Sequence, residues 1–356
     1  MSTDTPLRTA DTAPTAPVTR TRRTLGWDAA IIAVTLAFLV VASLGVEHFG
    51  TARNFGFLVL DLAPILLLAL PMTLIIITGD IDLSVASMVG LTSSAIGVMW
   101  DAGLPLETIL VLAVVLGAIL GAVNGFFVAV LGLPALAVTI GTLALYRGLS
   151  YVLLGDSAVA TFPRSFTGWT IGSVGWIPNI LPGLLLLVAV FAVVLHATPA
   201  GRAIYAIGAN VTAAAYAGIR VMRTRFLLFV TSGAVAGLVG AFWTMRFSSA
   251  RADNAFGLEL TVVAAVLLGG VSIFGGKGSL PGVFAGVVLL MSLQNALRLE
   301  RISTEALTVV TGSLLIISVL LPNVLARVRT ALRRRRPPEP DQIPTAAPAA
   351  QRKESP

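Results

Sequence analysis

Cysteine is absent from the 356-residue chain, and histidine occurs only twice, at His48 and His196. The first absence excludes disulfide bonds and thiolate metal sites, and two distant histidines do not indicate a metal centre. Charged residues make up 12% of the chain, about half of the roughly 25% that a soluble domain carries. Composition therefore argues against a soluble enzyme.

Apolar residues are abundant and occur in long runs. They make up 56% of the chain, and the mean hydropathy is +0.92. The runs are continuous over about 18–25 residues, the length of a transmembrane helix, and lack the alternation of a β-barrel strand. We predict an all-α, polytopic transmembrane bundle of about ten spans, at residues 28–46, 57–78, 83–100, 107–131, 134–153, 179–197, 226–247, 258–275, 280–297 and 305–325.

Positive charge is concentrated at the two ends of the chain. The formal net charge of +7 is carried by an N-terminal tail (1–27) and a Pro-rich C-terminal tail (327–356), which flank a membrane domain (28–326). The first tail is too poor in apolar residues to fold. Basic tails beside apolar spans indicate cytoplasmic ends and binding to the lipid bilayer, and no basic folded surface accompanies them to indicate nucleic-acid binding.

Two halves of the chain resemble each other. Residues 81–85 (IDLSV) align with 258–262 (LELTV), 135–143 (ALAVTIGTL) aligns with 306–314 (ALTVVTGSL), and Asn124 falls opposite Asn295. Five spans per repeat is an odd number, so the halves would be inverted in the membrane. Inverted repeats are typical of transporters, and chance similarity between apolar helices is the competing explanation.

The segment 198–225 lies on the same side as the termini in a ten-span topology. It contains four arginines and no acidic residue. Asn210 is a good N-cap and Gly218 a good residue to end a helix, so we predict a short helix between them. Such a helix is either a grip for another protein or a simple connection between two spans.

Glycines recur at four-residue spacing in three predicted spans. This spacing lets helices approach closely, so we interpret these glycines as packing residues: Gly117, Gly121 and Gly125; Gly233 and Gly237; Gly282 and Gly286. The glycine-rich segment 269–279 does not fit a phosphate-binding loop, because Gly278 follows Lys277 where serine or threonine is required. It predicts a tight turn.

Three motifs together resemble the permease subunits of bacterial sugar ABC importers, the type that serves ribose, xylose, rhamnose and autoinducer-2. Residues 201–221 resemble the cytoplasmic coupling segment of that family, 78–87 (TGDIDLSVAS) resemble its GGIDLSVGS signature, and 268–279 (LGGVSIFGGKGS) resemble its GGxSxxGGxGS signature. The resemblance covers about residues 28–325. Asp80 and Ala86 stand where the family usually has glycine, and these departures indicate a sub-branch. Residues 251–257 resemble the rhamnose and autoinducer-2 branches.

The resemblance implies a transport subunit in the bacterial plasma membrane that is not an enzyme and binds no cofactor. A separate ATPase subunit would bind ATP, an extracytoplasmic binding protein would deliver the sugar, and a second permease subunit, identical or related, would complete the path. The positions that it implies for coupling to the ATPase are Gly201, Arg202, Gly208, Asn210, Ala214 and Gly218.

Two further sets of candidates come from the residues themselves. Asp80, Asp82 and Ser84 lie at the entrance of the third predicted span, where a carboxylate caps a helix N-terminus, and Glu259 is the repeat counterpart of Asp82. Direct contact of these carboxylates with the solute is the alternative. Polar groups inside a membrane usually face a cavity or the bundle interior. The candidates for the translocation path are therefore Asn124, Thr139, Thr142 and Asn295, with Arg147 nearby.

Two other functions fit an inverted repeat. An ion-coupled secondary transporter would work alone, but the spans are poor in the buried carboxylates that such pumps use. An ABC permease for an amino acid or nucleoside would share the coupling segment, since solute choice often lies in the binding protein. An intramembrane enzyme would need paired reactive groups, which the sequence does not offer.

Overall fold

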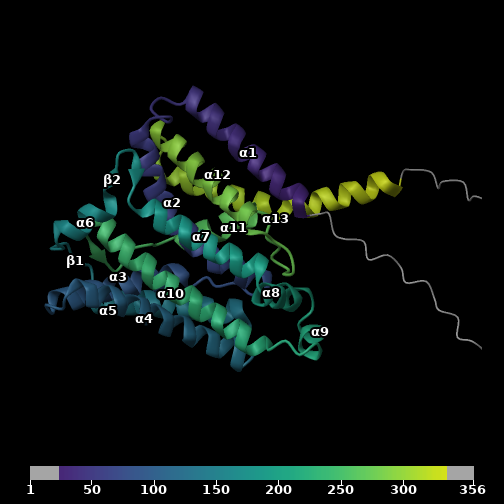
Figure 1. Cartoon of the computed structure of the whole chain (residues 1–356), viewed down its shortest axis with the longest axis horizontal. Helices are drawn as coiled ribbons and strands as arrows, with labels where there is room; N and C mark the ends of the chain where they lie inside the picture. The colour runs from purple at the N-terminus through teal and green to yellow at the C-terminus, as the bar shows by residue number, and fades with distance from the viewer. Residues whose placement is uncertain (1–23, 335–356) are drawn as a thin grey trace, which may run out of the picture.

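The computed structural model describes residues 24–334, which form a bundle of helices (Figure 1). The helices are α1 (Thr24–Gly45), α2 (Ala52–Ile77), α3 (Val85–Asp101), α4 (Leu106–Gly125) with the π-helical turn η1 (Phe126–Val130), α5 (Ala135–Leu154), α6 (Arg164–Ile171), α7 (Ile180–Ala197), α8 (Pro199–Ala209), α9 (Val211–Tyr216), α10 (Val221–Phe247), α11 (Leu258–Leu268), α12 (Leu280–Leu299) and α13 (Thr304–Arg334). Two antiparallel pairs of two-residue strands join β1 (Ala158–Val159) to β4 (Ala250–Arg251) and β2 (Ser173–Val174) to β3 (Ile177–Pro178).

Seven helices within the described range are long and apolar enough to cross a membrane. They are α1, α2, α4 with η1, α5, α7, α10 and α12. The remaining three predicted spans coincide with α3, α11 and α13. The prediction of a span over 258–275 is wrong in its extent, because α11 ends at Leu268 and the glycine-rich segment follows directly.

Helix α2 lies at the centre of the bundle. It is buried over most of its length and packs against α7, α10, α11 and α12. Its sequence from Ala63 to Ile77 is apolar on all sides apart from Thr73, which is typical of a helix surrounded by other helices rather than by water. Thr73 bonds to the carbonyl of Ala69 in its own helix.

The glycine spacing predicted from the sequence is confirmed as a packing device. Helices α4 and α10 run antiparallel, and a β-carbon at Gly117 or Gly121 would collide with the backbone of Gly233 or Phe229. A β-carbon at Gly286 would collide with the backbone of α11 in the same way, at Ala265. These pairs bring helix axes closer than larger residues allow.

The bundle has two distinct ends. At one end, here called the α9 end, α8 and α9 lie near the segments 78–84 and 269–279 (Figure 1, right); Gly276 N donates to Ile77 O (2.8 Å) and Tyr205 donates to Gly278 O (2.7 Å). At the opposite end, here called the α6 end, α6 lies with the two strand pairs (Figure 1, left).

Two boundaries differ from the prediction. The sequence predicts one short helix in segment 198–225, but the segment contains two, α8 and α9. In addition, α10 begins at Val221 rather than at residue 226. Thr198 caps α8 and Pro199 is its first residue, a combination that favours a helix start. At the chain ends, α1 begins at Thr24, inside the predicted N-terminal tail (1–27), and α13 continues to Arg334, inside the predicted C-terminal tail (327–356). The rest of both tails, 1–23 and 335–356, lies outside the described residues.

Candidate functional site

The predicted helix between Asn210 and Gly218 is confirmed as α9. The Asn210 side chain accepts a hydrogen bond from Ala213 N (2.9 Å), and Gly218 has φ +82°, which suits glycine alone without strain. Ala214 is buried, whereas Tyr216 is 89% exposed. Helix α9 is therefore fixed at both ends and anchored by one alanine, and presents most of its surface outward.

Helix α8 holds α9 against the bundle through two glycines. A β-carbon at Gly201 would collide with the carbonyl of Leu195, and one at Gly208 would collide with the carbonyl of Ile77 at the end of α2. Arg202 lies on the exposed side of α8. Of the six residues predicted for coupling, Arg202, Asn210 and Gly218 are exposed, whereas Gly201, Gly208 and Ala214 pack against the rest of the chain. Their part in coupling stays a prediction.

Asp80 links this end of α2 to the start of α10. Its carboxylate forms an ion pair with Arg225 (2.9 Å) and lies 3.4 Å from the Thr78 hydroxyl. Burial raises the pKa of Asp80 above its ordinary value, although the Arg225 guanidinium and the Thr78 hydroxyl act in the opposite direction. The predicted helix-capping role of Asp80 is wrong, because its partners lie on α10 and at the end of α2 rather than in α3.

Asp82 is the centre of a closed hydrogen-bond network. Its Oδ1 accepts from the Ser84 amide (3.0 Å) and hydroxyl (2.6 Å), its Oδ2 accepts from Ser232 on α10 (3.3 Å), and Asn124 on α4 donates to Ser84 Oγ (2.7 Å). Tyr146 on α5 lies 3.5 Å from the Asn124 oxygen. All these residues are buried, and burial raises the pKa of Asp82. The network ties segment 78–84 to three helices.

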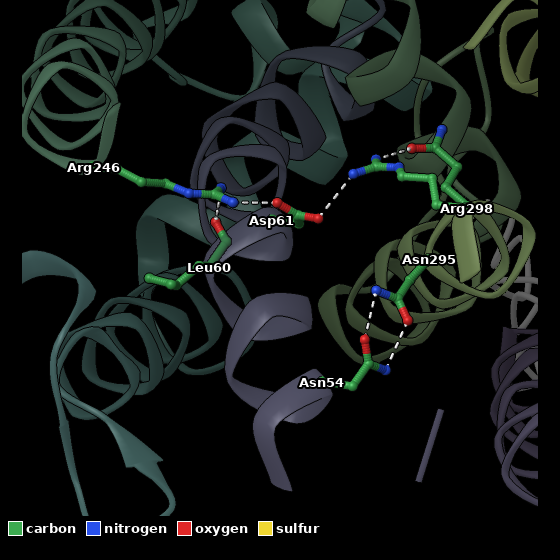
Figure 2. Close-up of polar contacts among 7 residues, drawn as sticks. Asn54, Leu60, Asp61, Arg246, Asn295 and Arg298 are labelled. Carbon is green, nitrogen blue, oxygen red and sulfur yellow. Dashed lines mark hydrogen bonds and ion pairs between the residues drawn. The ribbon is translucent and has the colours of Figure 1, made fainter. Parts of the chain in front are cut away.

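The four predicted path residues are buried within this chain. Thr142 bonds only to carbonyls of its own helix, and Thr139 also donates to Ile81 O (3.2 Å). Asn124 belongs to the Asp82 network. Asn295 exchanges two hydrogen bonds with Asn54 on α2 (2.9 and 3.1 Å; Figure 2). Their part in a solute path stays a prediction.

A second cluster lies nearer the α6 end and was not predicted. Asp61 on α2 pairs with Arg246 on α10 and with Arg298 on α12 (3.0 Å), and Figure 2 shows the two guanidinium groups approaching from opposite sides. Arg246 also donates to Leu60 O. Acidic and basic residues in different spans of one chain are the signal that could have found this cluster, since charges within a membrane pair with one another.

Glu259 differs from the other candidate carboxylates. It lies in the first turn of α11, as predicted from the alignment with Asp82. The side chain is half-buried, and its Oε2 atom is buried without a hydrogen-bond partner among the described residues. Segment 251–257, which precedes α11, lies beside α5 through Arg147, whose guanidinium donates to Asn254 O (3.1 Å).

Comparison with known proteins assigns the family. Residues 54–319 match the family described as branched-chain amino acid transport system / permease component. The chain belongs to this family of ABC importer permeases. The autoinducer 2 import system permease protein LsrD of Yersinia enterocolitica is 31% identical over 84% of this chain and 92% of the relative, and that of Photorhabdus luminescens is 31% identical over 83% and 90%. No solved structure matches.

Membership of this family confirms the resemblance drawn from the three motifs. The chain is a multi-pass membrane permease of the sugar-importer type, a transport component that works with an ATPase and a binding protein.

Proposed function

We propose that this chain imports a small sugar-like solute, autoinducer 2 or a related sugar such as rhamnose. A binding protein would deliver the solute, and a separate ATPase subunit would drive its passage. The similarity to autoinducer 2 permeases over most of both chains supports this solute class. The outward surface of α9, held rigidly by α8, is the observation that carries the mechanism.

Helices α8 and α9 form the surface that an ATPase subunit binds. Helix α9 is capped at both ends, and Gly208 of α8 contacts the backbone of Ile77 at the end of α2 and of Gly276 in segment 269–279. Gly201 contacts the end of α7 instead. A push on α9 would therefore move the end of the central helix. Such a movement changes which side of the membrane the path faces, provided that the ATPase binds the two states unequally.

The topology we propose has ten spans in two inverted halves, with both termini in the cytoplasm. Helices α3, α11 and α13 complete the seven longer spans. The packing of the halves supports the repeat: α4 packs on α10 as α12 packs on α2, α3 on α5 as α11 on α13, and α3 on α10 as α11 on α2. The α9 end would then face the cytoplasm and the α6 end the outside.

A second candidate solute is a branched-chain amino acid, which the description of the matching family names. The coupling surface would serve either solute. An ion-coupled transporter, the remaining alternative, requires no ATPase at α9.

Reconstitution tests this function. Liposomes would contain the permease, its ATPase and any second permease encoded beside it, with the binding protein added. We expect ATP hydrolysis to rise when the binding protein is loaded with autoinducer 2 or a related sugar. Stimulation by leucine alone would favour the amino-acid alternative, and uptake by the permease without ATPase would contradict the ABC mechanism.

The topology has its own test, made simple by the absence of native cysteine. A cysteine introduced in place of the exposed Thr212 of α9 should react with a membrane-impermeant thiol reagent only from the cytoplasmic side. Reaction from the outside would overturn the proposed orientation.

A further inference from the structure

One face of the bundle carries charged groups, which are costly to expose to lipid, beside an exposed aromatic ring. Helix α5 and the segment leading into α11 bring together Arg147, Phe256 and Glu259. The Arg147 guanidinium carbon lies 5.1 Å from the centre of the Phe256 ring, and Phe256 is 75% exposed. The carboxylates of Glu259 and Asp253 are close enough to interact with the charge of this guanidinium.

These groups lie well away from the α6 end of the bundle, measured along the helix axes. Arg147 is seven residues before the end of α5, about 10 Å at 1.5 Å per residue. Helix α11 runs antiparallel to α12, with Ala265 against Gly286. Glu259 therefore lies level with about Ser292, also roughly 10 Å before the end of α12. Both charges are thus at the depth of the membrane rather than at its surface.

Both groups have unused hydrogen-bonding capacity. Arg147 donates to Asn254 O, and a guanidinium has five donors. The Oε2 atom of Glu259 is buried and accepts no bond within the described part of the chain, and no arginine there lies within 4.0 Å of its carboxylate. An acceptor and a set of donors therefore attract each other without closing into an ion pair.

The exposed face of α7 provides the contrast. Its exposed large side chains are Leu185, Leu186, Val190 and Val193, which suit lipid tails. A carboxylate and a guanidinium facing lipid at this depth would cost several kcal/mol. The face formed by α5 and segment 251–260 must therefore face water or protein.

We propose that Arg147, Phe256 and Glu259 form a binding site for a polyhydroxylated solute on its way through the membrane. Glu259 accepts hydrogen bonds from solute hydroxyls, Arg147 donates to solute oxygens, and the Phe256 ring packs against the apolar face of the solute. The site rests on the proposed import of a sugar-like molecule. The residues that contact the solute in this proposal are thus partly exposed groups rather than the buried threonines of α5 that the sequence predicts.

A polar approach leads to this site from the α6 end. A cavity of about 70 Å³ is lined by Tyr151, Asp156, Arg251 and Asp253 among others. Arg251 and Asp253 pair with each other (2.8 Å), and Tyr151 lies one turn beyond Arg147 on α5. A solute released at the α6 end would meet these polar groups before it reached Arg147 and Glu259.

Single cysteines test whether the face formed by α5 and segment 251–260 is in contact with water. Leu260, next to Glu259, is 53% exposed and would be replaced by cysteine; Val190 on α7, 46% exposed, is the matched control. In liposomes, a charged thiol reagent should modify L260C and leave V190C unmodified. Autoinducer 2 at millimolar concentration should slow the modification of L260C at least threefold.

Three results would overturn the site. If L260C is as unreactive as V190C, the face is covered by lipid or protein. If cysteines at 260 cross-link between two copies of the chain and exclude the reagent, the face is a subunit interface. If L260C reacts at a rate unchanged by autoinducer 2, rhamnose or ribose, the face is wet but binds no sugar.

Transport by Glu259→Gln provides the second measurement. In the reconstituted importer, this variant should raise the KM for uptake at least tenfold, the effect of losing about 1.4 kcal/mol of binding. Glu107→Gln, at an exposed carboxylate at the start of α4, is the control and should match the wild type. An unchanged KM in E259Q would contradict the proposal. Failure of the wild type to take up any solute with ATP would instead refute the proposed function, and the labelling result would stand by itself.

Discussion

Asp82 and Glu259 occupy equivalent positions in the two aligned blocks of the sequence, yet their carboxylates have opposite surroundings. Asp82 is fully buried, and its two oxygens accept three hydrogen bonds. Glu259 is half-buried, and one of its oxygens accepts none within the described chain. Two acidic residues that the sequence aligns, Asp82 just before α3 and Glu259 in the first turn of α11, thus have different surroundings.

This difference separates stability from binding. A carboxylate whose acceptors are all occupied has nothing left for a ligand, and its removal leaves several donors unsatisfied. A half-buried carboxylate with an unbonded oxygen contributes less to folding, and its exposed part is the group that we propose for solute contact. The two asparagines aligned by the repeat also differ in their hydrogen-bond partners. Asn124 belongs to the Asp82 network, whereas Asn295 pairs with Asn54.

The largest expected effect is at Asp82. Asp82→Ala should lower the free energy of unfolding by about 3 kcal/mol, because the buried Ser84 and Ser232 hydroxyls and the Ser84 amide lose their acceptor. Thermal unfolding of the purified permease in detergent measures this. Asp101→Ala, at an exposed position, is the control. An unchanged melting temperature in D82A would show that the network does not stabilise the fold.

A smaller effect on folding but a large one on coupling is expected at Gly218. Gly218→Val forces a β-branched residue to φ +82°, at a cost of about 1–3 kcal/mol, and should distort the end of α9. In the reconstituted importer, solute transported per ATP hydrolysed should fall several-fold. Ala215→Val, exposed on the same helix, should retain coupling. Normal coupling in G218V would remove the role given to the fixed end of α9.

The smallest effect is expected at Asn295. Asn295→Ala should cost about 1 kcal/mol, the net value of a hydrogen-bonded pair, and less than Asn124→Ala. A double-mutant cycle with Asn54→Ala isolates the pair, since the second substitution should add little once the partner is gone. Additive losses would show that the two amides do not stabilise each other.

Much of this architecture could be predicted from the sequence because its causes are local. Length and hydropathy predict the long helices, and four-residue glycine spacing predicts close helix packing, which the structure shows between α4 and α10. The Asn210 and Gly218 caps predict α9. Each of these depends on residues close together in the chain.

The remaining features depend on contacts between distant residues. Asp80 was predicted to cap a helix and pairs instead with Arg225, more than a hundred residues away. The cluster of Asp61 with Arg246 and Arg298 also joins distant helices. The sequence cannot show that Asp82 is enclosed and Glu259 is not, because the partners come from other helices in three dimensions.

One experiment compares the two carboxylates directly. Asp82→Asn and Glu259→Gln would be made in the same permease, and melting temperature and ATP-driven uptake of autoinducer 2 would be measured for both. We predict that D82N lowers the melting temperature by several degrees, whereas E259Q melts like the wild type and loses uptake at low solute concentration. An E259Q protein that is destabilised like D82N, or that transports normally, would contradict the division between a structural and a solute-binding carboxylate.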